Sequence, residues 1–125
     1  MLPEEGEIVI NIYLDDSRPV PKGFILVKDV RSCTMLLMDN KNKVNILSLD
    51  HDLGEEPTYE TGYDVVKFLI NQYYLYNINY FPKKIYLHSA NPVGRMNMLQ
   101  LLERYKPDDV KVYNSPIEEF KSIWS

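Results

Sequence analysis

The chain has 125 residues, 45% of them hydrophobic and 26% charged, with a formal net charge of −4. This composition is that of one soluble globular domain, which we expect to span residues 1–125, and the acidic balance argues against duplex DNA as a partner. The single Cys33 cannot form an internal disulfide, the acidic N-terminus has no apolar signal region, and no run approaches the ~20 apolar residues of a membrane span. We therefore expect a cytoplasmic protein.

Apolar runs bounded by polar residues predict five buried strands. In chain order they are Glu7–Leu14, Phe24–Val27, Val44–Leu49, Lys84–Leu87 and Asp109–Tyr113. The segment Ser17–Gly23, after the first of them, carries two prolines and a glycine, so it predicts a loop.

Capping residues and helical spacing predict helices between the strands. Ser32 is a candidate cap for a short helix, and the four residues from Thr61 resemble a capping box. Asn91 suits an N-cap and Pro92 suits the first helical position. A closing helix is predicted over Pro116–Trp124. Because strands alternate with helices, we expect a single three-layer α/β domain with a mainly parallel sheet.

Polar side chains follow three of the predicted strands directly. They are Asp15-Asp16, Asp50-His51-Asp52 and His88-Ser89-Ala90-Asn91. The carboxyl ends of parallel strands meet at one edge of a sheet, where open α/β sheets bind ligands. Both histidines of the chain belong to this set, and their concentration beside acids predicts an enzyme site.

The pattern resembles the receiver domain of two-component signalling over nearly the whole chain. In that family an acidic pair ends the first strand and an acceptor aspartate ends the third; Asp15, Asp16 and Asp50 take these places. Ser115 stands where the family has an invariant lysine. The resemblance implies a five-stranded receiver- or flavodoxin-like sheet, with the first receiver helix shortened or replaced by a loop.

Where the chain departs from receivers, it resembles a narrower group, the cyclic-phosphate-processing receiver-like domains. Three motifs carry this resemblance, in the same order along the chain. They read Leu14-Asp15-Asp16-Ser17-Arg18-Pro19-Val20-Pro21, Ser48 to Gly54, and His88 to Gly94 followed by Asn97-Met98. The resemblance implies that the protein processes a cyclic phosphate.

The two histidines suit the chemistry of opening a cyclic phosphodiester. This reaction needs a base to activate water and an acid to protonate the departing ribose oxygen. Histidine can fill both roles near neutral pH, so we predict that His51 and His88 act as acid and base. A carboxylate, from Asp52 or Asp16, would hold a ring in the useful tautomer, and we assign Asp52 to the catalytic set.

Other polar residues near these histidines are candidates to bind the phosphate. Arg18 and Arg95 would contact its oxygens, helped by the helix N-terminus after Asn91. Ser89 is too weak a nucleophile without a dedicated base, so we assign it to hydrogen bonding with the phosphate.

Three carboxylates predict a cation site. Asp15, Asp16 and Asp50 are hard oxygen ligands of the kind that Mg²⁺ and Mn²⁺ prefer. Packed together without a cation, three negative charges would repel one another. We therefore expect a divalent cation, Mg²⁺ or Mn²⁺.

Three functions fit these residues. We expect hydrolysis of a cyclic phosphodiester, either a 2′,3′-cyclic phosphate at an RNA end or a cyclic nucleotide. A non-catalytic module that senses a cyclic nucleotide or an RNA end would need the same residues. A signalling receiver would accept phosphate on Asp50, although the missing lysine at Ser115 argues against it. The sequence does not determine the oligomeric state.

Four of the ten tyrosines cluster near the end of one predicted helix. Tyr73, Tyr74, Tyr76 and Tyr80 predict either a platform on which bases stack or amphipathic packing with hydrated hydroxyls. Packing is the interpretation we favour.

Overall fold

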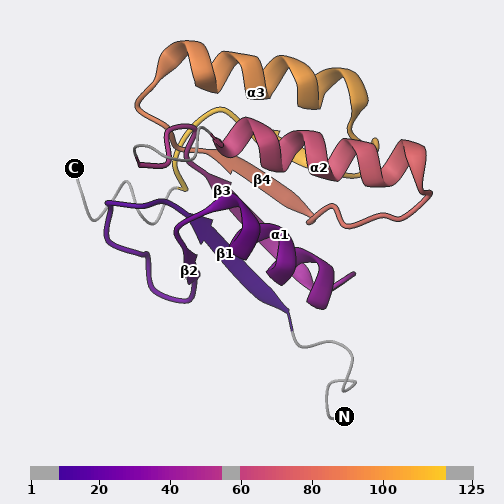
Figure 1. Ribbon diagram of the computed structural model, residues 1–125, viewed down its shortest axis with the longest axis horizontal. Helices are drawn as coiled ribbons and strands as arrows, with labels where there is room; N and C mark the ends of the chain where they lie inside the picture. Colours follow the sequence, from indigo (N-terminus) through magenta and orange to yellow (C-terminus); the bar gives the residue numbers. More distant parts are fainter. Residues whose placement is uncertain (1–8, 55–59, 118–125) are drawn as a thin grey trace.

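The computed structural model describes residues 9–54 and 60–117. Figure 1 shows its strands and helices. The strands are β1 (Ile10–Leu14), β2 (Ile25–Val27), β3 (Val44–Leu49), β4 (Lys84–Leu87) and β5 (Lys111–Tyr113). The helices are α1 (Val30–Asp39), α2 (Gly62–Leu75) and α3 (Pro92–Tyr105). Within the described part of the chain, no helix has the length and apolarity that a membrane crossing requires.

The five strands form one parallel sheet in the order β2-β1-β3-β4-β5. This is the flavodoxin-like order, in which the winding of the chain reverses between β1 and β3. The chain passes from β1 to β2 through a loop, and no helix lies between these strands. The predicted replacement of the first receiver helix is confirmed. A ligand crevice is expected at the carboxyl ends of β1 and β3.

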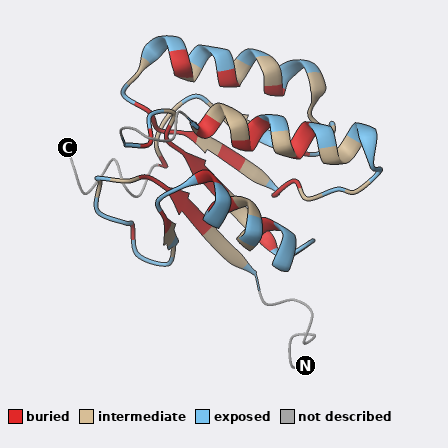
Figure 2. Ribbon diagram, viewed as in Figure 1, coloured by how far each residue is buried: buried red, intermediate tan, exposed pale blue. Residues whose placement is uncertain are grey.

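All three helices cover one face of the sheet (Figure 2). Side chains alternate along a strand, and the inward set from β1, β3 and β4 is fully buried against the helices: Ile12, Leu14, Leu47, Leu49, Ile85 and Leu87. The opposite face carries a smaller cluster built on Tyr13 and Ile117, with Tyr86 packed against it. The closing helix predicted over Pro116–Trp124 falls mostly on residues 118–124, which lie outside the described residues, as do residues 7 and 8 of the first predicted strand.

Side-chain caps determine where the helices begin. Asp29, not Ser32, caps α1, and its carboxylate accepts a hydrogen bond from the Ser32 N–H at 2.7 Å; the prediction for Ser32 was wrong because the helix begins one turn earlier. The capping box at Thr61 is confirmed, with Asp64 accepting from the Thr61 N–H at 2.7 Å. Asn91 caps α3 as predicted. The last two caps place the starts of α2 and α3 next to the carboxyl edge of the sheet.

Candidate functional site

Three buried polar residues stand side by side where β1, β3 and β4 end. Backbone hydrogen bonds align them: the Asp50 N–H donates to the Leu14 carbonyl and the His88 N–H donates to the Leu49 carbonyl, both at 3.0 Å. Asp15, Asp50 and His88 are 0%, 8% and 3% exposed. Acids are rarely this buried unless they are paired. The carboxyl edge of the sheet thus holds three ionisable side chains that are buried from solvent.

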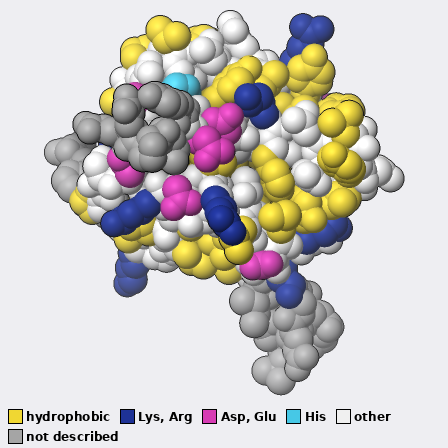
Figure 3. All heavy atoms as spheres, in the orientation of Figure 1, with side chains coloured by type: hydrophobic (Ala, Val, Ile, Leu, Met, Phe, Trp, Pro, Cys, Tyr) yellow, Lys and Arg dark blue, Asp and Glu magenta, His cyan; other side chains and the backbone are white. Residues whose placement is uncertain are grey.

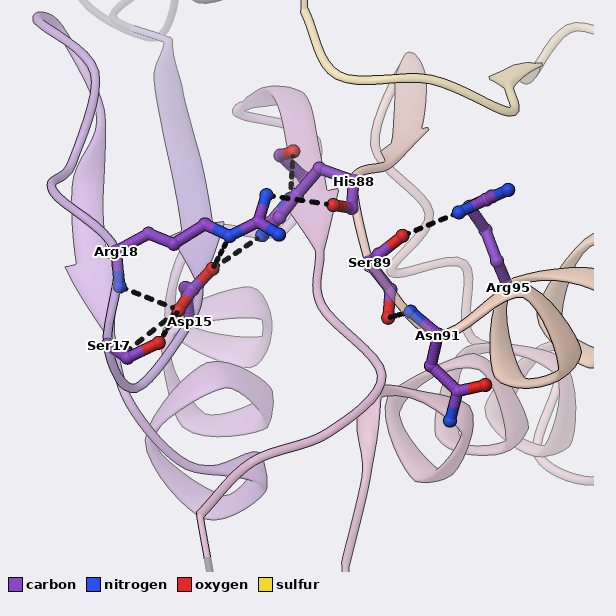
Figure 4. Close-up of polar contacts among 8 residues, drawn as sticks. Asp15, Ser17, Arg18, His88, Ser89, Asn91 and Arg95 are labelled. Atoms are coloured by element: carbon purple, nitrogen blue, oxygen red, sulfur yellow. Dashed lines mark hydrogen bonds and ion pairs between the residues drawn. The ribbon is translucent and has the colours of Figure 1, made fainter. Parts of the chain in front are cut away.

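Both nitrogens and one face of the His88 ring have partners, and Figure 4 shows the polar contacts. Its Nε2 lies 2.9 Å from Oδ2 of Asp15, and its Nδ1 lies 2.7 Å from Oγ of Ser48. One face of the ring stacks on Tyr13, with ring centroids 4.3 Å apart and planes 3° from parallel. An ionised carboxylate only accepts hydrogen bonds, so Nε2 carries a proton. His88 therefore has no free ring nitrogen in this arrangement.

Asp15 is stabilised in its charged form. Burial by itself raises the pKa of this carboxyl, but the hydrogen bonds from His88 and from the N–H groups of Ser17 and Arg18 outweigh burial and lower the pKa to about 2. Both N–H groups lie 2.9 Å from Oδ1 (Figure 4). Asp15 is thus a fixed negative charge at the centre of the edge.

Asp50 is in the opposite situation. Burial raises its pKa, and the negative charge of Asp15 raises it further, while His88 and a hydrogen bond from Ser89 only partly counter these effects. A positive charge between the two carboxylates would relieve this repulsion. Ligand atoms of Asp15, Asp50 and His88 all lie within 4.8 Å of one another and could hold a metal ion.

The donor set fits a hard divalent cation in part. Two carboxylates are suitable ligands for Mg²⁺ or Mn²⁺. The third group, the imidazole of His88, has its nearest nitrogen protonated and bonded to Asp15. In this arrangement His88 orients a ligating carboxylate, as partners behind metal ligands commonly do.

Asp16 lies outside this group, although we expected it to join Asp15 and Asp50. Successive side chains leaving a strand point to opposite sides, so the two adjacent acids separate. The carboxylate of Asp16 points toward Gly54 in the loop after β3, where a Cβ on Gly54 would lie 3.2 Å from Oδ2.

Unlike His88, His51 has a ring nitrogen that no other described residue contacts by a hydrogen bond. Its Nδ1 lies 2.7 Å from Oδ1 of Asp52, and this hydrogen bond lowers the pKa of Asp52. Asn91 donates from Nδ2 to both carboxylate oxygens of Asp52, at 3.2 and 3.4 Å. The side chain of His51 is 18% exposed, and among the described residues no hydrogen bond reaches its Nε2.

The first turn of α3 fixes the position of the His51 ring. A Cβ built on Gly94 would lie 2.3 Å from Cγ of His51, so only a glycine leaves room for the ring. Gly94 is also the residue whose N–H donates to the capping side chain of Asn91, at 3.0 Å. One cap thus orients Asp52 and places the glycine under the histidine.

The two histidine rings lie in different environments. His51 packs against α3, on the helix side of the sheet, whereas His88 stacks on Tyr13 in the cluster of the opposite face. This differs from the expected pair of rings on two sides of one phosphate. The reason is strand alternation: Leu87 faces the helices, so His88 turns away from them. Proton transfer by His88 stays a prediction.

Two arginines brace the segment after β4 (Figure 4). Arg18 donates to the His88 carbonyl at 3.1 Å, and its Nε lies 3.8 Å from Oδ2 of Asp15. Arg95 donates to the Ser89 carbonyl at 2.7 Å and to the side chain of Asn114 at 2.9 Å. Each guanidinium has five N–H donors, so these bonds leave others for a ligand.

The sequence interpretation missed two members of this network, Ser48 and Tyr13. Ser48 had a signal, because it is a polar residue inside the otherwise apolar end of β3. Tyr13 had none, since a tyrosine in a strand is ordinary. Ser89, which we assigned to the ligand, is buried, and its Oγ accepts a hydrogen bond from the Asn91 N–H at 3.0 Å.

Comparison with protein families agrees with this architecture. Residues 10–104 match the family described as the cyclic-phosphate processing receiver domain. The chain belongs to this family. The matched range runs from β1 to the last turn of α3 and includes every residue assigned to the site above. Comparison with curated proteins and with solved structures finds no match.

Proposed function

We propose that this receiver-like domain binds and hydrolyses a cyclic phosphodiester, with His51 as the general base. The observation that carries the proposal is the His51–Asp52 pair. The carboxylate accepts the hydrogen of the Nδ1–H group and so directs the lone pair of the neutral ring to Nε2, which has no hydrogen-bond partner among the described residues. The pair lies beside the ligand edge of the sheet, next to Asp50 in the chain.

The reaction opens the cyclic ester to a monoester. A water oxygen forms a bond to phosphorus while Nε2 of His51 takes its proton. The bond between phosphorus and one ribose oxygen breaks, and its electron pair stays on that oxygen, which then takes a proton from solvent. Asp52 stabilises the imidazolium that forms, and Asn91 holds Asp52 in place.

The acidic edge would bind the phosphate through a cation. Mg²⁺ or Mn²⁺, held by the carboxylates of Asp15 and Asp50, would supply positive charge for the phosphate oxygens. His88 positions Asp15 through its hydrogen bond. The remaining donors of Arg18 and Arg95 would contact the same oxygens.

A panel of cyclic phosphates tests the proposal. The purified protein would be incubated with 2′,3′- and 3′,5′-cyclic mononucleotides and a cyclic dinucleotide, with and without Mg²⁺ or Mn²⁺, and products resolved by chromatography. His51→Ala should lower kcat by about 100-fold or more, with a smaller effect on binding. A matched control is Lys41→Ala, an exposed residue after α1. Wild-type turnover in His51→Ala would refute the role of His51.

A sensor is the second candidate, and one observation favours it. Because both ring nitrogens of the buried His88 are bonded, the site offers one free acid–base ring instead of two. A sensor would bind a cyclic nucleotide or an RNA end tightly and return it unchanged in the same incubation. The signalling alternative predicts that acetyl phosphate labels Asp50, which mass spectrometry would detect.

A further inference from the structure

A groove runs along the outer surface between α2 and α3. It consists of two hollows of about 370 and 280 Å³. Both are lined by Tyr63, Leu101 and Tyr105, so they join into one groove, which we call the α2–α3 groove. Figure 3 shows side chains of the hydrophobic class, in which tyrosine is included, gathered on this side of the molecule.

The groove combines aromatic rings with positive charge. Tyr63, Tyr74 and Tyr105 line it together with Lys67 and Arg104. The Lys67 ammonium lies 5.4 Å from the centroid of the Tyr63 ring, and the Arg104 guanidinium lies 5.4 Å from that of Tyr105. These contacts keep cations beside ring faces.

The charge of the groove is unlike that of the protein. The chain has 18 acidic and 14 basic residues, yet no acidic residue is among the described residues that line the two hollows. The hollow on the other side of α2 includes both Glu60 and Asp64. Lys67 also pairs with Asp64 at 3.3 Å, on the side away from the groove's tyrosines 74 and 105. The described lining of the groove therefore carries two cationic side chains, Lys67 and Arg104, and no carboxylate, on a protein that is acidic as a whole.

The near end of the groove lies within one helical turn of residues that contact the proposed catalytic histidine, His51. The Gly62 N–H donates to the His51 carbonyl at 2.9 Å, and Tyr63 is the next residue. On α3, Gly94 lies against the His51 ring, and Asn97, which lines the groove, follows one turn later. Tyr105 lies three turns beyond Gly94, or about 16 Å along the helix. A ligand bound at His51 could thus continue along the groove.

We propose that the α2–α3 groove binds the single-stranded RNA that precedes a 2′,3′-cyclic phosphate end. Bases stack on the tyrosine rings, and Lys67 and Arg104 face the phosphates. Aromatic stacking with nearby cations is how proteins bind single strands without reading their sequence. The inference rests on the proposed function for the cyclic end at His51. It narrows the substrate from any cyclic phosphate to an RNA end, because a mononucleotide would reach only the near end of the groove.

Tyr74 presents an exposed ring at the groove, whereas Tyr63 and Tyr105 are partly buried against the core. Tyr74 is 57% exposed, and its hydroxyl donates to the Tyr105 carbonyl at 2.9 Å. The two rings meet edge to face, with centroids 6.0 Å apart. This hydrogen bond reduces the rotational freedom of an exposed ring, so less entropy is lost when a base stacks on it.

Binding measurements with two probes test the inference. Fluorescence anisotropy would measure the affinity for a short labelled oligoribonucleotide that ends in a 2′,3′-cyclic phosphate, and calorimetry would measure that for a 2′,3′-cyclic mononucleotide. Tyr105→Leu, which keeps apolar bulk but removes the ring, should weaken oligonucleotide binding by about 5-fold or more. The double variant Lys67→Ala, Arg104→Ala should weaken it and reduce its salt dependence.

The mononucleotide affinity should stay unchanged in all these variants. Arg31→Ala is the matched control, because it removes one positive charge from the hollow on the other side of α2; it should change neither affinity. The double variant truncates two exposed side chains, Lys67 and Arg104, and should therefore fold. It keeps the test valid if Tyr105→Leu does not fold.

Several results would overturn the inference. One is a wild type that binds the oligonucleotide no more tightly than the mononucleotide; another is an equal loss for both probes in the groove variants. A third is a wild type that sediments as a dimer and does not bind RNA, together with a Leu75→Glu variant that sediments as a monomer. That result would assign the groove to a second copy of the chain. Groove-dependent oligonucleotide binding without turnover would support the groove and refute only the hydrolysis.

Discussion

Asp15→Asn should remove a stabilising contribution that depends on pH. In the folded protein the pKa of Asp15 is about 2, against an ordinary value of 3.8. At roughly 1.4 kcal/mol for each pH unit of difference, the charged carboxylate contributes about 2 kcal/mol to the free energy of unfolding. The side chain is fully buried, so solvent screening does not reduce this figure.

The sign of the effect follows from the lowered pKa. The contribution is fully present above pH 3.8 and is lost as the pH falls through about 2, because the folded state must then take up a proton that it binds weakly. Asp50 acts in the opposite direction. Its pKa is raised, so its ionisation above pH 3.8 costs stability, and part of that cost comes from Asp15.

Urea unfolding at intervals from about pH 5 to about pH 2 would measure both effects. Between about pH 2 and pH 4 the stability difference between wild type and Asp15→Asn should grow by about 2 kcal/mol. Above pH 4 it should shrink in part as Asp50 ionises beside Asp15. In an Asp50→Asn background this shrinkage should disappear. Parallel stability profiles for wild type and Asp15→Asn would refute the assignment of the charged carboxylate.

Three further predictions concern the site and its supports. Millimolar Mg²⁺ or Mn²⁺ should raise the Tm of the wild type but should hardly change that of Asp15→Asn. The Tm of Asp16→Asn should rise as in the wild type, because Asp16 lies outside the candidate metal group. Equal shifts in all three proteins would rule out the site. Gly94→Ala should displace the His51 ring and lower kcat, and a parallel Tm measurement would show whether the variant is still folded. Unchanged kinetics would show that the ring position is irrelevant. Thr61→Ala should cost about 1 kcal/mol of unfolding free energy, measured in urea, through loss of the capping box, and no loss would contradict the cap.

The sequence by itself determined the order of the elements and the edge where the site lies. β3 and β4 were predicted with their observed ends, since both are apolar runs flanked by polar residues. The caps at Thr61 and Asn91 were predicted as well, because capping depends on residues within one turn of the helix start. Such local signals also separated β1 from β2 by a loop instead of a helix.

Local signals failed where a boundary depended on competing candidates. Asp29 caps α1 although Ser32 is also a good capping residue. β5 is shorter than its predicted range, because the backbone of Pro107 to Val110 forms a turn before Lys111.

The roles within the site depend on which side of the sheet each side chain takes. The sequence placed both histidines and four acids at one edge, but it could not show that His88 stacks on Tyr13 and bonds to Asp15 and Ser48. The partners lie in or directly after β1 and β3, His88 itself follows β4, and only the parallel register of these three strands brings the residues together. Chain neighbours diverge for the same reason: Asp15 enters the buried group and Asp16 does not.

The free nitrogen of His51 is likewise a product of tertiary structure. Its orienting partner Asp52 is adjacent in sequence, but Asn91, which holds Asp52, and Gly94, which makes room for the ring, come from the start of α3. A sequence lists the residue types that can carry a proton. Whether a given ring nitrogen is free or bonded is decided by packing between elements far apart in the chain, because hydrogen bonding and burial are properties of the assembled edge.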